Sequence, residues 1–207
     1  MNPSELFLKR TKKHYLYNIQ PISNISSILR YGILCYDLAD KIPHESIALN
    51  DVQQRRELVK VPNGKKLHQY ANLYFTYNNP MLYMRKEQAE ELCILVVSNK
   101  VLDIQDCILT DRNASTDLVK FYTPEDGINQ IQFEKVFSQY WTHENAYEQN
   151  NHKAIKCAEV LIPKKIPYLY ILGAYAVSET AKIKLLNEQF DRKIIVDPKV
   201  FYRKEVH

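Results

Sequence analysis

The order of hydrophobic and polar residues predicts short strands and helices that alternate along the whole chain. Runs of apolar, β-branched and aromatic residues that end in turn residues predict strands. These runs lie at Tyr15 to Ile19, Asn72 to Tyr77, Glu91 to Ser98, Leu118 to Tyr122, Lys156 to Ile162, Leu169 to Val177 and Lys193 to Val196. Helical patterns are interspersed among them, and this mixture predicts an α+β fold.

The first helix is predicted from apolar residues that recur at helical spacing between a capping signal and a stop signal. Ile25, Ile28 and Leu29 share one helical face. Ser23 is expected to be the N-cap, because its hydroxyl can accept a bond from a free N–H of the first turn. Gly32 is expected to end the helix, because glycine readily adopts the left-handed conformation.

Three further segments complete the predicted elements. Asp51 is expected to cap a helix over DVQQRREL, and a helix starting at Pro124 is expected to run to about Gln139. Another helix is predicted from about Glu179 to Phe190. The polar stretch from Gln139 to Ile155 is expected to be a loop with one helical turn at most. Loops of that length in a compact domain are often functional.

Length and composition predict a single domain over residues 1–207. The chain is 45% hydrophobic and 25% charged, which suits one core and excludes a disordered chain. No segment resembles a secretory signal or a membrane span, and the four cysteines form no CxxC pair. A cytoplasmic monomer that does not bind a membrane is therefore expected. The histidines show no ligand spacing, so no metal site is expected.

Two residue counts change this picture. With only four glycines, the chain cannot form a GxGxxG, Walker or GxSxG motif, so a glycine-rich loop cannot hold a nucleotide. Fifteen tyrosines supply flat rings and hydroxyl groups that suit stacking, although ordinary core aromatics would explain them equally well. The net charge of +4 permits a polyanionic partner without requiring one.

The segment KCAEVLIP contains a candidate catalytic carboxylate. Side chains alternate between the two faces of a strand, so Cys157, Glu159 and Leu161 are expected to share one face. A carboxylate between a cysteine and a leucine requires solvation. Glu159 is therefore either an outward-facing residue of an edge strand or a carboxylate in a cleft.

Arg55 and Arg56 are candidate anion-binding residues. Neighbouring helical side chains point about 100° apart, so at most one of the two can face a cleft. A guanidinium group donates two parallel hydrogen bonds to a carboxylate or a pyrophosphate. The alternative is that both arginines belong to a solvated helix face.

Aromatic residues suggest two further surfaces. Tyr74, with its neighbours in NLYFTYNNPMLY, lines either a slot for a flat ring or part of the core. Tyr140, Trp141 and Tyr147 lie in the polar stretch together with Lys153, a mixture that suits splayed bases and a phosphate chain. For Trp141, anchoring of the loop and stacking on a base are equally compatible with the sequence.

Four segments taken together resemble the DarT family of DNA ADP-ribosyltransferases. They are LYNIQPISNISSILRYGIL, SIALNDVQQRRELVKVP, LYFTYNNPMLY and the strand with Glu159, and the resemblance extends from about Tyr15 to Tyr202. It implies an ADP-ribosyltransferase fold with a split, mostly antiparallel β core, a NAD cleft between two sheets and peripheral helices. It also implies a toxin that transfers ADP-ribose from NAD to thymine or guanine in single-stranded DNA. The implied partner is an antitoxin that removes ADP-ribose.

The resemblance assigns roles to individual residues. Glu159 corresponds to the catalytic glutamate and Arg56 to the functional arginine. The expected NAD contacts are Tyr17, Asn18, Ile19, Ser26, Leu34, Arg56 and Tyr74. Residues 39–57 correspond to the NAD-binding element, and about 119–158 to a substrate-recognising loop region. Many members have His-x-Thr where this chain has Asn18-Ile19-Gln20, a difference that bears on the subgroup and on the base modified.

The implied chemistry needs few groups. Nicotinamide leaves NAD as a neutral molecule, so one carboxylate that stabilises the cationic sugar suffices. Glu159 is assigned this role, and Arg56 is expected to bind phosphate or orient the incoming base. Two alternatives remain open at this stage: an enzyme of the same fold that acts on RNA ends or protein, and a silent nucleic-acid-binding module.

Overall fold

The structure, a computed structural model, describes residues 1–47, 50–62 and 64–203 and contains one large sheet. Its strands follow the order β10 (Lys193–Val196), β9 (Ile171–Ala176), β4 (Leu92–Ser98), β1 (Tyr15–Pro21), β3 (Tyr70–Tyr74), β7 (Glu159–Pro163), β5 (Ile108–Thr110) and β6 (Phe121–Tyr122). Neighbouring strands are antiparallel except β9 and β10, which are parallel. This mixed architecture confirms the predicted α+β class.

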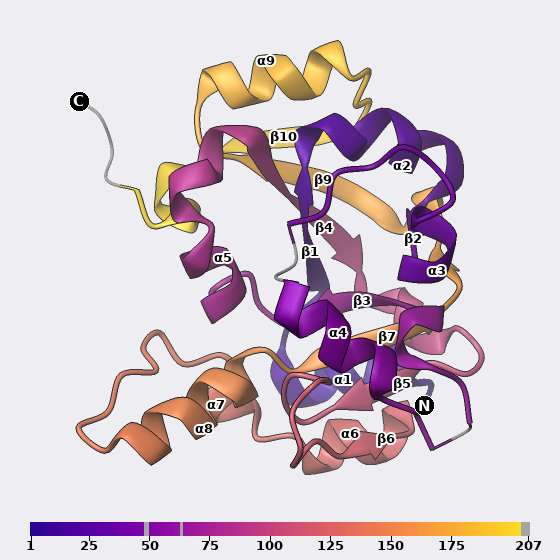
Figure 1. The fold of residues 1–207 in the computed structure, drawn as a ribbon, viewed down its shortest axis with the longest axis vertical. Coiled ribbons are helices and arrows are strands. Elements are labelled where there is room, and N and C mark those ends of the chain that lie inside the picture. Colours follow the sequence, from indigo (N-terminus) through magenta and orange to yellow (C-terminus); the bar gives the residue numbers. More distant parts are fainter. Residues whose placement is uncertain (48–49, 63, 204–207) are drawn as a thin grey trace.

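The large sheet is split between β1 and β3. Strand β1 pairs with β4 along its whole length, but its register with β3 consists of the single pair Tyr17 and Tyr74. The sheet therefore diverges into two halves beyond this pair, and in Figure 1 β1 and β4 run across the direction of β3 and β7. A small second sheet pairs β2 (Ile33–Leu34) with β8 (Lys165–Ile166).

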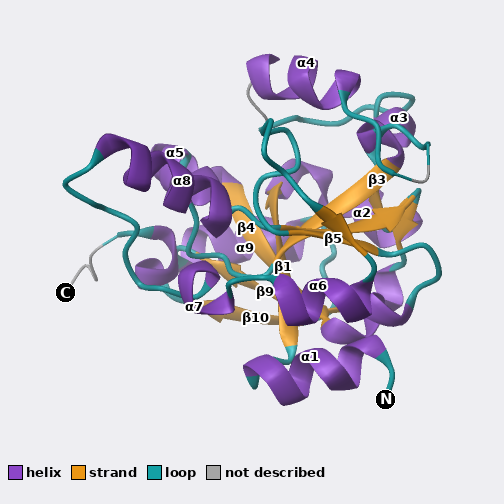
Figure 2. Ribbon diagram, turned by 90° about the horizontal axis from the view of Figure 1, so that it is seen from below, coloured by secondary structure: helices purple, strands orange, loops and turns teal. Residues whose placement is uncertain are grey.

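Helices surround the sheets on several sides (Figure 2). The α-helices are α1 (Pro3–Thr11), α2 (Ile25–Tyr31), α3 (Tyr36–Ala39), α4 (Asn50–Leu58), α5 (Pro80–Met84), α6 (Pro124–Gln130), α7 (Phe133–Val136), α8 (Ala146–Lys156) and α9 (Glu179–Asn187). Within the ranges that the structure describes, no helix is long and apolar enough to cross a membrane. All four cysteines are buried and free.

Helix α1 was not predicted, although its start carries a clear local signal. Asn2 and Glu5 form a reciprocal capping box, and Pro3 occupies the first helical turn. Phe7 is fully buried and packs against Phe75 and Phe133. The capping box and this one aromatic anchor together explain why a largely polar N-terminal segment is helical.

Most predicted strands are present, some with shifted ends. The strands expected at Lys193 to Val196 and Glu91 to Ser98 are confirmed to within one residue. The stretch from Lys156 to Ile162 begins as strand only at Glu159, because α8 extends through Lys156. Cys157 therefore does not share a strand face with Glu159, contrary to the prediction. Of Leu118 to Tyr122, only the last two residues are strand.

The predictions that Ser23 and Asp51 are N-caps were wrong, whereas the prediction that Gly32 ends a helix was confirmed. The Ser23 hydroxyl bonds Glu45 rather than a helix N–H, and Asp51 lies inside the first turn of α4. Gly32 ends α2 with a φ of 83°. A Cβ at this position would lie 2.2 Å from the carbonyl oxygen of Ile166, so the close approach of β8 also requires glycine.

The loop predicted from Gln139 to Ile155 was wrong, because most of this stretch is α8. Asn145 caps the helix by accepting bonds from the N–H groups of Tyr147 and Glu148. The single helix expected from Pro124 to about Gln139 is divided into α6 and α7, because Ile131 between them has an extended backbone. The region that the resemblance assigns to substrate recognition is thus largely helical.

Candidate active site

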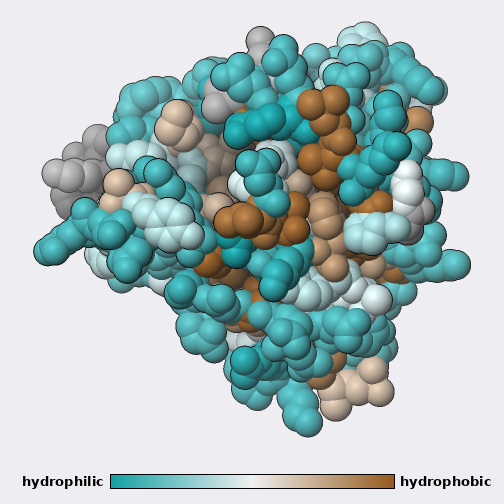
Figure 3. Space-filling model, turned by 60° about the horizontal axis from the view of Figure 1, so that its bottom comes forward, coloured by the Kyte–Doolittle hydropathy of each residue, from teal (hydrophilic) through white to brown (hydrophobic). Residues whose placement is uncertain are grey.

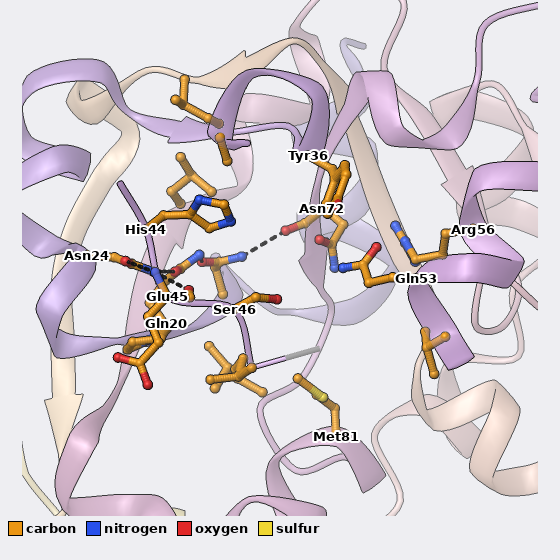
Figure 4. A pocket seen from close by; sticks show the side chains of 18 of the residues that line it. Gln20, Asn24, Tyr36, His44, Glu45, Ser46, Gln53, Arg56, Asn72 and Met81 are labelled. Carbon is orange, nitrogen blue, oxygen red and sulfur yellow. Dashed lines mark hydrogen bonds between the residues drawn. The ribbon is translucent and has the colours of Figure 1, made fainter. Parts of the chain in front are cut away.

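A pocket of about 350 Å³ opens where the sheet splits. Its lining comes from β1 and β3 on the two halves of the sheet, from residues 42–47, and from helices α3, α4 and α5. In the close-up of Figure 4, Arg56 lies on one side of this pocket, and Asn24 with Glu45 lies on the other. Figure 3 shows apolar residues exposed in the middle of a mostly hydrophilic face of the molecule.

Arg56, in the last turn of α4, forms a buried ion pair with Glu159, the first residue of β7. The Nη1 atom of Arg56 lies 3.0 Å from Oε1 and 3.1 Å from Oε2 of Glu159. The Glu159 side chain is 0% exposed and that of Arg56 is 11% exposed. Burial alone would lower the pKa of the Arg56 guanidinium, but the charge and hydrogen bonds of Glu159 outweigh it and raise that pKa. The Arg56 guanidinium therefore keeps its charge inside the protein.

The loop after β5 holds the Glu159 carboxylate from a second side. The backbone N–H of Ala114 donates to Oε1 of Glu159 over 2.9 Å. Thr110 is fully buried, and its hydroxyl accepts a bond from the N–H of Glu159 at 3.0 Å. Both the carboxylate and the backbone of Glu159 are thus fixed, so its oxygens have a defined direction.

Two aromatic residues border the ion pair. Tyr74 is the cross-strand partner of Glu159, and burial, followed by the negative charge of Glu159, raises the pKa of its phenol. His68 stacks on Tyr36 with ring centroids 4.2 Å apart. Burial and the neighbouring Arg56 lower the pKa of His68, so its ring is neutral at pH 7 and contributes a flat, uncharged wall.

A chain of amide hydrogen bonds crosses the pocket from β3 to residues 42–47. Asn18 donates to the carbonyl of Asn72 at 3.0 Å, and Gln20 donates to Oδ1 of Asn18 at 2.8 Å. Asn24 donates to Gln20 and exchanges two bonds with the backbone of Glu45. In Figure 4, Gln20, Asn24 and Glu45 lie together on one side of the pocket, and Asn72 lies nearer its middle. Residues 42–47, which cover the pocket, are therefore held to strand β1 by hydrogen bonds.

The predicted cofactor residues divide into two groups in the structure. Asn18, Ile19, Leu34, Arg56 and Tyr74 all line the pocket. Tyr17 packs its ring edge-to-face on Tyr77, with centroids 5.1 Å apart, and Ser26 bonds Glu188. Neither Tyr17 nor Ser26 lines the pocket.

The four predicted DNA-binding residues lie around α8 rather than in one loop. Tyr140 and Tyr147 are 70% and 73% exposed, and Lys153 is half-buried. Trp141 packs edge-to-face on Tyr83 and Tyr202, with centroid distances of 6.1 and 6.3 Å. Its ring therefore anchors the segment between α7 and α8.

Several residues of the site carried no recognised sequence signal. They are Asn24, His68, Asn72, Arg85 and Asn113, which all line the pocket. Arg85 donates to the carbonyl of Ile47 and so supports the end of the covering segment. The turn-forming run DRNAST could have indicated a structured loop near Asn113.

The split antiparallel sheet, with a buried carboxylate and an arginine at the junction, defines an ADP-ribosyltransferase fold with its cleft. Residues 17–202 match the sequence profile of a family described as "DarT: ssDNA thymidine ADP-ribosyltransferase". Because this match covers most of the chain, the protein belongs to the DarT family.

Relatives of similar sequence support this assignment. A DNA ADP-ribosyl transferase of Thermus sp. (strain 2.9) is 27% identical over 84% of this chain and 88% of its own length. A DNA ADP-ribosyl transferase–DNA ADP-ribosyl glycohydrolase fusion protein of Thermosipho africanus is 28% identical over 90% of this chain. The alignment covers 49% of that fusion protein, so this chain corresponds to about half of it.

Solved structures show the same architecture. The fold resembles Thermus sp. 2.9 DarT in complex with ADP-ribosylated ssDNA, with a TM-score of 0.80 over 92% of this chain and 97% of that chain at 24% identity. It also resembles Thermosipho africanus DarTG in complex with ADP-ribose, with a TM-score of 0.77 and 26% identity over 92% of this chain and 51% of that chain.

Proposed function

We propose that this protein transfers ADP-ribose from NAD to the thymidine base of single-stranded DNA. The observation that carries the proposal is the Arg56–Glu159 pair at 3.0 Å, in which Arg56 lines the pocket of a DarT fold and Glu159 is fully buried against it. A buried ion pair adds little to stability compared with apolar residues of the same volume, so its presence beside a pocket favours a chemical role. The acceptor base follows from the family to which the chain belongs.

The lining of the pocket fits the NAD donor in size and chemistry. Apolar and aromatic walls suit the flat nicotinamide and adenine rings, and the amides of Asn18, Gln20 and Gln53 suit their polar edges. Arg56 and Arg85 supply the positive charge that a pyrophosphate requires. Asn18 has the donor and acceptor atoms to replace the histidine of other family members.

Glu159 has the position and charge to stabilise the sugar cation. Cleavage of the bond between nicotinamide and ribose leaves an electron-poor ribose carbon, and a fixed carboxylate stabilises the transition state more than the ground state. When NAD is bound, the ribose hydroxyls would replace Arg56 as hydrogen-bond donors to the Glu159 carboxylate. A nitrogen of the base then attacks the ribose carbon as the bond to nicotinamide breaks, and the proton of that nitrogen passes to solvent water.

The DNA strand is proposed to cross the surface beside α8. Tyr140 and Tyr147 present exposed rings there, and Lys153 supplies a positive charge. Trp141 supports the same surface through its contacts with Tyr83 and Tyr202. An unpaired strand is the favoured substrate, since a base in a duplex must first leave its stack.

The biological setting follows from the family. We propose a toxin that acts as a monomer in the cytoplasm, countered by a separate antitoxin with ADP-ribosyl glycohydrolase activity. The Thermosipho africanus fusion protein joins both activities in its printed name, which supports such a pairing.

Glu159→Gln tests the proposed function. The amide keeps the shape of the side chain and can still accept bonds from Arg56 and Ala114, so the fold and NAD binding should persist. Transfer should fall by about 10²–10³-fold, because the charge that stabilises the cationic sugar is removed. The measurement is incorporation of label from NAD into separate pools of single-stranded DNA, RNA and protein.

Each outcome of that assay has a defined meaning. Label in thymidine-containing DNA for the parent and its loss in the variant would support the proposal. Equal labelling by both proteins would remove Glu159 from the mechanism. Label in guanine-containing DNA alone would change the acceptor base, and label in RNA or protein alone would overturn the DNA assignment.

A further inference from the structure

A second hollow of about 230 Å³ lies between the loop after β5 and helix α8. Its lining includes Arg112, Thr116 and Leu118 from the loop, and Tyr147 and Asn150 from the helix. None of these residues belongs to the pocket beside Arg56. The hollow is therefore distinct from that pocket.

Exposed apolar groups border this hollow on both sides. Tyr147 is 73% exposed and Leu118 is 66% exposed, so folding has buried little of either side chain. A tyrosine ring and a leucine side chain in one lining offer apolar surface to a flat ligand. Polar groups lie between them, because Thr116 and Asn150 belong to the same lining.

Arg112 contributes directed hydrogen-bond donors rather than a free positive charge. Its guanidinium contacts both oxygens of Asp111, at 3.4 and 3.3 Å, and donates to Oδ1 of Asn151 at 3.1 Å. Asp111 neutralises the charge and fixes the plane of the group. A guanidinium has five N–H donors, more than these contacts use. This arrangement suits the carbonyl edge of a base better than a phosphate.

The loop that carries Arg112 is fixed to the backbone of Glu159. The Thr110 hydroxyl donates to the carbonyl of Arg112 at 2.7 Å and accepts from the N–H of Glu159 at 3.0 Å. Two residues further along, Ala114 donates to the Glu159 carboxylate. The second hollow therefore has a set position relative to the proposed catalytic group.

Asn113 joins the two hollows. It lines the pocket beside Arg56, while its neighbour Arg112 lines the second hollow. The N–H of Asn113 donates to the carbonyl of Ala154 in α8 at 2.9 Å, which holds the loop against the helix. One side of this loop thus faces the proposed reaction site, and the other faces the hollow.

We propose that the second hollow binds the unpaired base next to the acceptor in the DNA strand. This inference rests on the proposed function, because the acceptor must reach the ribose beside Glu159. The adjoining nucleotide would then meet the loop at Arg112. Its base stacks on Tyr147 and receives hydrogen bonds from Arg112 and Asn150. Such a contact requires a base free of its complement, so it also selects single-stranded DNA.

The test uses single-stranded oligonucleotides with one thymidine, either intact or with an abasic site on one side of it. For the parent protein, an abasic site at one of the two adjoining positions should raise the KM for DNA by about 5-fold to 100-fold. Tyr147→Ala should raise the KM by a similar factor on the intact strand. It should add little on the abasic strand, because the stacked pair is already lost. The KM for NAD should not change.

Tyr31→Ala is the matched control, since Tyr31 is another exposed helical tyrosine and lines neither hollow. Asn150→Ala is a second test variant and should lower the preference among bases at the adjoining position. Equal effects of Tyr147→Ala on intact and abasic strands, or no effect on either, would overturn the subsite. Absence of labelling of every oligonucleotide by the parent would instead overturn the proposed function on which the subsite rests.

Discussion

Arg55 and Arg56 are adjacent in the sequence and differ completely in their surroundings. Arg55 is exposed and donates to the carbonyl of Asp51 in its own helix. Arg56 is buried against Glu159, which lies 103 residues away in the chain. The helical rotation between neighbours allows one of them to enter the pocket and leaves the other in water. This contrast provides an internal control for the ion pair.

Arg56→Ala should reduce transfer by at least roughly 100-fold, whereas Arg55→Ala should leave the rate within about twofold of the parent. The first change removes the donor that orients Glu159 and leaves a buried carboxylate without its partner, at about 3–5 kcal/mol of stability. Steady-state rates with labelled NAD, together with urea unfolding of each variant, measure both effects.

Arg56→Lys separates the two effects. It retains the charge and most of the stability, but it lacks the planar guanidinium and its additional N–H donors, so it should hold Glu159 in a less defined orientation. Small and equal losses for the Arg55 and Arg56 variants would contradict the assignment of Arg56 to the site.

For single residues, the sequence identified candidate functional side chains but could not predict the contacts that they make. Glu159 on a strand and one of two adjacent arginines on a helix could be selected from local pattern. Their hydrogen bond could not, because it depends on how α4 lies across the sheet. The role of Ala114 was also inaccessible, since it acts through its backbone N–H and any residue has one. Ser26 was expected to contact NAD but does not line the pocket, and its hydroxyl bonds Glu188 instead. A polar residue on α2 can face either the pocket or α9.

Helix α8 ends in a lysine that is fully buried. The Lys156 ammonium donates to the carbonyls of Val136 and Ser138 at 2.9 and 2.7 Å, which ties the end of α8 to the segment after α7. Burial lowers its pKa from 10.5 to about 8. The protein thus places a partly charged group beneath the surface proposed to face DNA.

The stability of the parent relative to Lys156→Met should rise between pH 8 and about pH 10. In this range the unfolded chain still binds the proton of Lys156 while the folded protein has released it, so deprotonation favours folding. The gain should be about 1 kcal/mol per pH unit. Urea unfolding of both proteins at several pH values measures the difference, in which the other titrating groups cancel. A difference that does not vary with pH would show that Lys156 keeps its ordinary pKa in the folded protein.

The element-scale errors have a common physical origin. Residues 139–155 are predominantly polar, and this composition favoured a loop. Yet His152 and Ile155 face the interior, and Asn145 supplies the cap that starts the helix. The helix contains few apolar residues and has only a narrow buried face, so composition favoured a loop although packing against the core makes the segment helical. By contrast, β4 is buried along most of its length and was predicted almost to the residue.

The molecule places the two hollows described above on either side of the loop after β5. This separation suits a reaction with two substrates that must meet at one atom. Under the proposed function, the donor would enter beneath residues 42–47, and the acceptor would approach past α8. No helix-turn-helix or zinc module follows from the sequence, and the net charge is only +4. Little in this arrangement would offset the cost of opening a duplex.

A duplex should therefore be modified roughly 100-fold more slowly than the same strand alone. Extruding a paired base costs a few kcal/mol, and the acceptor nitrogen cannot reach the ribose while it is stacked and paired. The measurement offers one thymidine-containing oligonucleotide with excess NAD, first alone and then annealed to its complement. Equal labelling of the two forms would contradict the single-strand requirement. A mismatch opposite the acceptor should restore part of the rate, because it reduces the cost of extrusion.

Trp141 is the only tryptophan of the chain, so its indole is an intrinsic fluorescent probe of its surroundings. The indole lies edge-on to Tyr83 and Tyr202, with the Lys156 ammonium 5.6 Å from its centre. Indole emission responds to a nearby charge, to solvent and to a stacked base. Excitation of this single chromophore therefore reports on the segment between α7 and α8 without any attached dye. Stopped-flow mixing could then time the arrival of the DNA strand separately from that of NAD.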